Sequence, residues 1–275
     1  MPKTAPLKSS PLPDRFPCCA TTPRGPSTSG IPWPGVAILR TRAVLADAHT
    51  IRLAGGETVR AAHVLIATGG APSLGGPIPG REHVISSNEA FHLPALPPRV
   101  LIQGGGYIAL EFAGIFAGLG SAVTLIYRGT NILRGFDDDV RTHLRAEMER
   151  HGIAIMTGDT VAAVEQTGSA YTVLLAGGKR IEVDRVMFAT GRKPNVNGLG
   201  LEAVGVTVAE SGHIAVDEFS RTSVPNIYAV GDVTNRINLT PVAIRENRRC
   251  HRRPRPLRRQ SRSQGCSAGA KILTC

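Results

Sequence analysis

The chain has 275 residues, of which 42% are hydrophobic, and a formal net charge of +11, values that suit one or two globular domains. Most of the positive charge lies at the ends: residues 1–34 carry four basic residues and one acid, and residues 247–275 carry nine basic residues and no acid. The middle of the chain is therefore close to neutral, which argues against an extended nucleic-acid-binding face.

Several other classes of protein are disfavoured by the pattern of residues. No apolar run approaches the roughly 18 residues that a membrane helix needs, and the N-terminus lacks the apolar segment of a secretory signal. All five cysteines lie in the two ends without the spacing of metal ligands, so we expect free thiols in a cytoplasmic protein. Neither residues 1–34 nor residues 247–275 show helical or strand periodicity, and we expect both segments to be disordered.

The first part of the globular region, residues 35–98, predicts short strands and one short helix. Two strands flank a Gly-Gly turn signal, which indicates a hairpin. A buried strand then runs into a second glycine pair, and Ser86 or Ser87 is expected to cap a short helix that reaches Phe91. The expected strands cover residues 36–39, 43–45, 50–53, 58–60 and 64–68.

A strand, a glycine-rich turn and a helix follow one another in the middle of the chain. The strand ends in Gly104-x-Gly106-x-x-Ala109. Gly104 permits a tight turn, Gly106 allows the backbone to approach a pyrophosphate, and Ala109 keeps helix and strand close. The helix is apolar nearly all round, so we expect it to be deeply buried. A second strand at residues 123–127 completes a βαβ dinucleotide fingerprint.

Two arginines after this second strand indicate which dinucleotide binds. An acid here would bind a ribose 2′-hydroxyl, whereas arginine accommodates a 2′-phosphate. No Asp or Glu lies between Ser121 and Phe136, but Arg128 and Arg134 do. Because charge-assisted bonds to phosphate contribute roughly 1.5–3 kcal/mol each, we predict NADP(H) rather than NAD(H). The alternative is that both arginines are solvated surface residues.

The rest of the chain predicts one helix and a series of short strands. Asp137 or Asp138 starts the helix, which ends at Gly152. The strand at residues 185–189 runs into Thr-Gly and repeats the pattern of residues 66–69. The other expected strands cover residues 153–156, 160–164, 171–175, 181–183, 214–216 and 226–232.

Four motifs occur in order along the chain: Ile66-Ala-Thr-Gly69, Gly104-Gly-Gly-Tyr-Ile-Ala109, Ala189-Thr-Gly-Arg-Lys-Pro-Asn195 and Tyr228-Ala-Val-Gly-Asp232. Together they resemble the pyridine nucleotide–disulfide oxidoreductase family over about residues 35–246. The likeness is greatest to its glutathione reductase branch, because of the six-residue spacing of Arg128 and Arg134 and the run Leu239-Thr-Pro-Val-Ala243.

The resemblance implies an α/β fold, with a Rossmann-type βαβ NADP-binding domain and part of a second, FAD-binding α/β domain. Tyr107 would move aside for the nicotinamide of NADPH, and Glu111 would lie near its amide. Asp232 would accept a hydrogen bond from the ribityl chain of FAD. The implied residues around NADPH are Gly104, Gly106, Tyr107, Ile108, Ala109, Glu111, Arg128, Arg134 and Gly191. Those implied around FAD are Thr68, Gly69, Arg192, Asp232 and Thr240.

Some features of the family are missing from this sequence. It has no second glycine fingerprint for FAD, so the FAD site is incomplete, and no two cysteines are separated by the four residues of the family's redox pair. The match stops near Glu246, before the dimerisation domain with its catalytic histidine. We therefore name no catalytic residue and no metal ligand. We expect the chain as it stands to be inactive, because disulfide exchange requires a nucleophilic thiolate.

The implied function is NADPH-dependent flavoprotein disulfide reduction in cell redox homeostasis, with glutathione disulfide as substrate. The family's homodimer would lack its dimerisation domain here. A non-catalytic NADPH-binding remnant and another family member, such as mercuric reductase, are the alternatives. We expect neither a nucleic-acid nor a membrane partner. The expected parts are a disordered non-family segment (1–34), a partial FAD-binding domain (35–70), an NADP-binding domain (71–204), a second FAD-domain segment (205–246) and a disordered arginine-rich tail (247–275).

Overall fold

The computed structural model describes residues 37–251 and 270–273, and it describes side chains up to residue 248. The described residues from Thr41 onward belong to one compact unit. They form a mixed α/β fold with parallel sheets, which confirms the predicted fold class.

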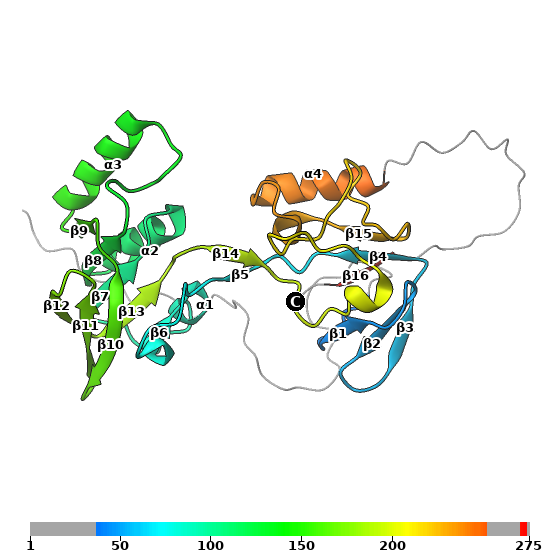
Figure 1. The fold of residues 1–275 in the computed structure, drawn as a ribbon, viewed down its shortest axis with the longest axis horizontal. Coiled ribbons are helices and arrows are strands. Elements are labelled where there is room, and N and C mark those ends of the chain that lie inside the picture. The colour runs from blue at the N-terminus through cyan, green and yellow to red at the C-terminus, as the bar shows by residue number, and fades with distance from the viewer. Residues whose placement is uncertain (1–36, 252–269, 274–275) are drawn as a thin grey trace, which may run out of the picture. The chain divides into compact units, whose positions relative to one another are not determined.

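A five-stranded sheet forms the centre of the region that contains the glycine-rich turn (Figure 1). Its strand order is β6-β13-β7-β8-β9, and every neighbouring pair is parallel. Strands buried on both faces read as continuous apolar runs, and Val100, Leu101 and Ile102 of β7 have no exposed surface. The strands are β6 (Val84–Ile85), β7 (Arg99–Gln103), β8 (Ala122–Tyr127), β9 (Ala154–Thr157) and β13 (Arg185–Phe188).

Three helices belong to this region. Helix α1 (Ser87–Ala90) is capped by Ser86, as predicted, with Glu89 completing a capping box. Hydrogen bonds from Ser86 hold the pKa of Glu89 below its usual range. Figure 1 shows α2 (Tyr107–Gly118) and α3 (Asp138–Arg150) beside the parallel sheet, and Asp137 caps α3 as predicted.

The prediction that α2 is deeply buried is wrong for one of its faces. Ala109, Phe112 and Ala113 pack into the core with the strands of the sheet. On the other side of the helix, Ile115 is 48% exposed and Leu119, just after its end, is 64% exposed. A helix that lies on one face of a sheet buries a single stripe, so its remaining apolar positions face solvent.

A three-stranded antiparallel sheet packs against the parallel sheet through a shared core that includes Leu101 and Phe188. The chain enters β7 beside this sheet, where Asp184 accepts hydrogen bonds from the backbone N–H of Arg99 and from its guanidinium. The Arg99 side chain holds the pKa of Asp184 below its usual range. The strands are β10 (Val161–Thr167), β11 (Ala170–Leu175) and β12 (Arg180–Val183).

A second α/β region is built around β4 (His63–Ile66), which pairs in parallel with β15 (Ile227–Ala229) and β16 (Ala270–Leu273). The predicted hairpin is present within an antiparallel sheet of β1 (Ala43–Leu45), β2 (Thr50–Leu53) and β3 (Thr58–Arg60). These strands share one core with Leu199 and Ile214. The remaining elements are helix α4 (Thr240–His251) and the 3-10 helices η1 (Arg81–His83), η2 (Glu202–Val204) and η3 (Gly231–Thr234).

The structure differs from the sequence prediction in three further places. Residues 247–251 continue α4 and residues 270–273 form β16, so the prediction that the whole tail is disordered is wrong there. After Pro241, which a first helical turn tolerates, no Gly or Pro interrupts α4. The expected strand at 214–216 is only an isolated bridge, and residues 37–39 have no regular structure. The rest of the predicted disordered ends lies outside the described residues.

A two-stranded antiparallel ribbon is one of the elements that the sequence did not predict; α4, β6 and β16 are others. Strand β5 (Gly70–Pro72) pairs with β14 (Arg192–Pro194). The two strands come from the two Ala-Thr-Gly motifs, and the Thr68 hydroxyl donates to the Asn195 carbonyl at 2.7 Å. Each strand follows its Gly directly and contains a proline, a composition typical of turns, so neither shows a strand pattern.

Candidate functional site

A pocket of about 560 Å³ lies where β7, β8 and β13 end at the carboxyl edge of the parallel sheet. Ligands of open α/β sheets bind at this edge. The lining contains three arginines and no carboxylate, which favours an anionic ligand. The lining residues are Gly75, Gly76, Gln103, Gly104, Gly105, Gly106, Tyr107, Ile108, Ile126, Tyr127, Arg128, Arg134, Thr160, Ala189, Thr190, Gly191, Arg192 and Asn238.

Gly104 occupies a position that only glycine fits. Its φ is +153°, a value that side-chain-bearing residues rarely adopt. A Cβ on Gly104 would lie 2.4 Å from the carbonyl oxygen of Ala189 and 3.0 Å from the Cβ of Ala109. The small residue at 109 therefore lets α2 start against the turn, which is the role that the motif predicts for it.

Gly106 has a different role, because it is the N-cap of α2 and has an ordinary φ of −88°. A Cβ at this position would meet nothing within 4 Å, so Gly106 faces open space in the pocket. No side chain caps this end of α2. The free N–H groups and the positive end of the helix dipole are consequently available to a phosphate in the pocket.

Tyr127, at the end of β8, was not predicted as a site residue. A Cβ on Gly105 or on Gly129 would lie 2.5 Å from its ring, so the ring lies against both glycines. The ring also lines the pocket. The sequence gives no signal for this role, because Gly105 and Gly129 come together against the ring only in the folded chain.

Arg128 and Arg134 both line the pocket and are both exposed. Within residues 37–251 and 270–273, neither side chain has a hydrogen-bond or ion-pair partner. Leu133, directly before Arg134, donates its N–H to the Gly105 carbonyl at 2.6 Å. This bond joins the segment that carries the arginines to the glycine-rich turn, so both parts of the predicted site lie side by side.

A second group of predicted residues lies around the β5–β14 ribbon. The Nε of Arg192 lies 3.8 Å from Oδ2 of Asp232, and Arg192 also donates to the Gly70 carbonyl. The Gly69 carbonyl accepts the N–H of Asn195 at 3.0 Å. Thr68, Gly69, Arg192 and Asp232 therefore belong to one connected cluster, whereas Thr240 is exposed at the start of α4.

Buried Glu246 supports the turn that carries Asp232, a contribution that sequence analysis missed. Its Oε2 accepts the backbone N–H of Gly231 at 2.9 Å, and its Oε1 lies 3.6 Å from Nη1 of Arg236. Residues 239–243 form one of the motifs that resemble the family. The spacing between this motif and Glu246 does not indicate that the Glu246 carboxylate reaches back to Gly231.

The structure therefore divides the predicted site residues into three groups. Eight line the pocket: Gly104, Gly106, Tyr107, Ile108, Arg128, Arg134, Gly191 and Arg192. Ala109 is buried behind the turn, and Glu111 is exposed on α2 outside the lining. The other four, Thr68, Gly69, Asp232 and Thr240, are also outside the lining.

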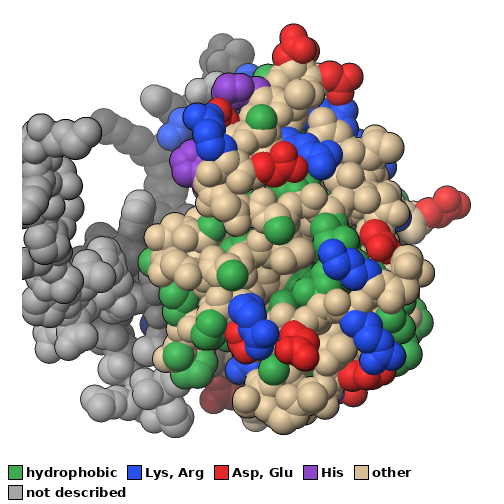
Figure 2. All heavy atoms as spheres, turned by 90° about the vertical axis from the view of Figure 1, so that its left-hand side faces the viewer, with side chains coloured by type: hydrophobic (Ala, Val, Ile, Leu, Met, Phe, Trp, Pro, Cys, Tyr) green, Lys and Arg blue, Asp and Glu red, His purple; other side chains and the backbone are tan. Residues whose placement is uncertain are grey.

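Other kinds of site find little support in the described part of the chain. Residues 37–251 and 270–273 contain no group of three or more His, Cys, Asp or Glu side chains that could hold a metal ion. None of the helices described is both long and apolar enough to cross a membrane. Figure 2 shows basic and acidic side chains interspersed on one face, without one continuous basic area there.

The sequence is similar to known disulfide reductases. A family profile described as pyridine nucleotide-disulphide oxidoreductase matches residues 32–246. A glutathione reductase from Burkholderia cepacia is 52% identical over 211 residues, which cover 77% of this chain and 46% of that protein. A trypanothione reductase from Trypanosoma congolense is 52% identical over 195 residues, which cover 69% of this chain and 39% of that protein. The chain thus spans about half the length, or less, of these curated relatives.

A solved structure with a similar fold is the HOCl-induced flavoprotein disulfide reductase RclA from Escherichia coli. It superposes with a TM-score of 0.74 at 29% sequence identity, over 78% of this chain and 50% of that one.

Proposed function

The chain belongs to the pyridine nucleotide–disulphide oxidoreductase family, and we propose that it supplies the NADPH-binding part of an NADPH-dependent flavoprotein disulfide reductase. One observation carries the proposal: the pocket combines an uncapped helix start with Arg128 and Arg134, which have no partner among the described residues, and no carboxylate lines it. This combination suits a ligand that carries both a pyrophosphate and a further phosphate.

Each end of NADPH has residues that suit it. The pyrophosphate would be held by the first N–H groups of α2 beside Gly106, where a Cβ would meet nothing within 4 Å and no side chain blocks an approach. The 2′-phosphate would be held by Arg128 and Arg134, whose guanidiniums have no competing partner among the described residues. Tyr107 lines the pocket at the start of α2 and is 48% exposed, so it would be able to move aside for the nicotinamide. The family resemblance alone suggests that Glu111 would lie near the nicotinamide amide, since Glu111 is exposed on α2 and outside the pocket lining.

FAD, when bound, would carry electrons from the nicotinamide to a disulfide. The residues that suit one side of FAD are the cluster around the β5–β14 ribbon, in which Asp232 is fixed by its turn and by Arg192. We propose that Thr68, Gly69, Arg192, Asp232 and Thr240 contact FAD. The sequence offers no second glycine fingerprint for the flavin pyrophosphate, so this set is incomplete.

The substrate that we propose for the complete reaction is glutathione disulfide, in a cytoplasmic homodimer. The relative from Burkholderia cepacia suggests this branch, since it is named glutathione reductase. A second candidate is a protein that binds NADPH without catalysis. It is favoured by the cysteine positions, because no two of the five cysteines are separated by four residues.

Retention on a column of immobilised adenosine 2′,5′-bisphosphate tests the proposed function. We expect the full chain to bind this column and to be eluted by NADPH, but not by the same concentration of NADH, because only NADPH presents a 2′-phosphate to the arginines. Elution by both nucleotides at equal concentrations, or failure to bind, would contradict the proposal.

Flavin binding distinguishes a disulfide reductase from a protein that binds NADPH without catalysis. We expect this chain to bind FAD weakly. After incubation with excess FAD and gel filtration, the protein peak is expected to show no flavin absorbance, because the sequence has no second glycine fingerprint for the flavin pyrophosphate. Oxidation of NADPH in the presence of FAD and glutathione disulfide is expected to match the protein-free blank, since no two cysteines have the four-residue separation of the family's redox pair. Stoichiometric FAD with steady turnover would support the complete enzyme instead.

A further inference from the structure

The segment that carries the two pocket arginines, residues 128–134, is here named the arginine loop. Its inner residue Ile132 has no exposed surface and packs into the core beside the parallel sheet. Leu133 has a φ of +55°, in the left-handed region that residues other than glycine seldom adopt. Such a conformation persists only when the surrounding structure holds it in place.

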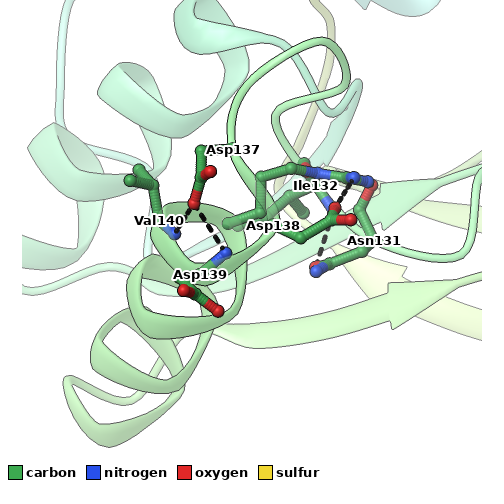
Figure 3. Close-up of polar contacts among 7 residues, drawn as sticks. Asn131, Ile132, Asp137, Asp138, Asp139 and Val140 are labelled. Carbon is green, nitrogen blue, oxygen red and sulfur yellow. Dashed lines mark hydrogen bonds and ion pairs between the residues drawn. The ribbon is translucent and has the colours of Figure 1, made fainter.

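Helix α3 supplies contacts that hold the arginine loop. Arg141 donates from Nε to the Ile132 carbonyl at 2.8 Å and from Nη2 to the Asn131 carbonyl at 3.1 Å, while its Nη1 bonds the Asp138 carboxylate. The Arg141 side chain is only 17% exposed. Figure 3 shows Asn131 and Ile132 beside Asp138 at the start of α3, with Asp137 turned toward the N–H groups of Asp139 and Val140.

A guanidinium is the side chain suited to these contacts. It presents donors in a planar, rigid fork, so one group can bind two adjacent carbonyls and a carboxylate. A lysine at the same place would keep the charge, but its single nitrogen cannot reach three acceptors in the same plane. The contribution of Arg141 to the loop thus depends on its shape as well as on its charge.

We propose that Arg141 is a positioning residue that sets the preference for NADPH over NADH by keeping the arginine loop ordered before the nucleotide arrives. The proposal rests on the proposed function of the pocket. Arg141 itself does not line the pocket, but the carbonyls that it binds directly precede Leu133 and Arg134. A loop that is already ordered does not lose conformational freedom on binding, and this raises affinity. NADH has no 2′-phosphate to meet the arginines, so we expect its affinity to depend much less on the order of this loop.

The variant Arg141→Lys tests the proposal in the full chain, with Arg150→Lys as the matched control. Arg150 lies on the same helix, pairs with Glu147 and has a side chain that is 65% exposed. We expect Arg141→Lys to weaken NADPH binding about tenfold while changing NADH binding less than about twofold. In the nucleotide-free protein, the amides of the arginine loop are expected to exchange with deuterium about tenfold faster. Arg150→Lys is expected to change neither quantity.

The two measurements separate this proposal from the proposed function. If the unaltered chain binds no NADPH, the proposed function fails, and loop exchange still shows whether Arg141 orders the loop. The proposal about Arg141 is overturned if loop exchange in Arg141→Lys matches that of the unaltered chain. It is also overturned if the variant loses affinity for NADPH and NADH by the same factor, which would show a general structural role.

Discussion

Replacing both Arg128 and Arg134 by alanine is expected to weaken NADPH binding about 100-fold at low ionic strength, while NADH binding changes less than about threefold. Each lost charge-assisted bond to phosphate costs roughly 1.5–3 kcal/mol, and every 1.4 kcal/mol is a factor of ten in affinity. Both side chains are exposed, so salt will reduce the difference. Calorimetric titration of the variant with each nucleotide measures the effect.

A suitable control is the double variant Arg52→Ala and Arg60→Ala. These arginines are also exposed, but they lie on β2 and β3 and do not line the pocket. We expect this control to bind NADPH as the unaltered chain does. If both double variants lost NADPH affinity equally, the effect would come from net charge and not from a 2′-phosphate site.

The second large effect is expected from the variants Gly104→Ala and Gly106→Ala, which separate folding from binding. At position 104, the methyl group would lie 2.4 Å from a backbone carbonyl oxygen and φ is +153°, so we expect a loss of roughly 1–3 kcal/mol in unfolding free energy. At position 106, the methyl group meets nothing within 4 Å and φ is ordinary. The Gly106 variant is therefore expected to keep its stability.

Both glycine variants are expected to bind NADPH and NADH at least tenfold more weakly, because both nucleotides place the same pyrophosphate against the turn. Urea denaturation followed by fluorescence measures the stability, and titration with each nucleotide measures the binding. Unchanged affinity in Gly106→Ala would show that the pyrophosphate does not approach this residue. A selective loss of NADPH binding alone would contradict the shared contact.

Local signals in the sequence predicted the parts of the fold that depend on neighbouring residues. The turn at Gly104, the helix that follows it and the cap of α3 at Asp137 all have a short-range cause, and all are present. The exposed face of α2 was not predictable, because the apolar pattern does not show how many elements cover the helix. The pairing of β5 with β14 was missed for a similar reason, since these strands are joined by contacts more than a hundred residues apart.

In the candidate site, too, the residues with a local sequence signal were predictable, and those whose roles depend on distant segments were not. Gly106, Arg128 and Arg134 line the pocket. Their place was predictable because the βαβ dinucleotide fingerprint fixes their spacing in the sequence. The roles of Tyr127 and Arg141 depend on where other segments pass: Tyr127 lies against two glycines, and Arg141 binds carbonyls nine and ten residues earlier in the chain. No periodicity or motif encodes such contacts.

We propose that the pocket selects NADPH through its 2′-phosphate, and calorimetric titration of the full, unaltered chain with NADPH and with NADH is the decisive experiment. We predict that NADPH binds with a dissociation constant at least tenfold lower than that of NADH, and that this ratio falls as salt is added, because the arginines that distinguish the two nucleotides are exposed. Equal dissociation constants for the two nucleotides, at low salt, would contradict the account.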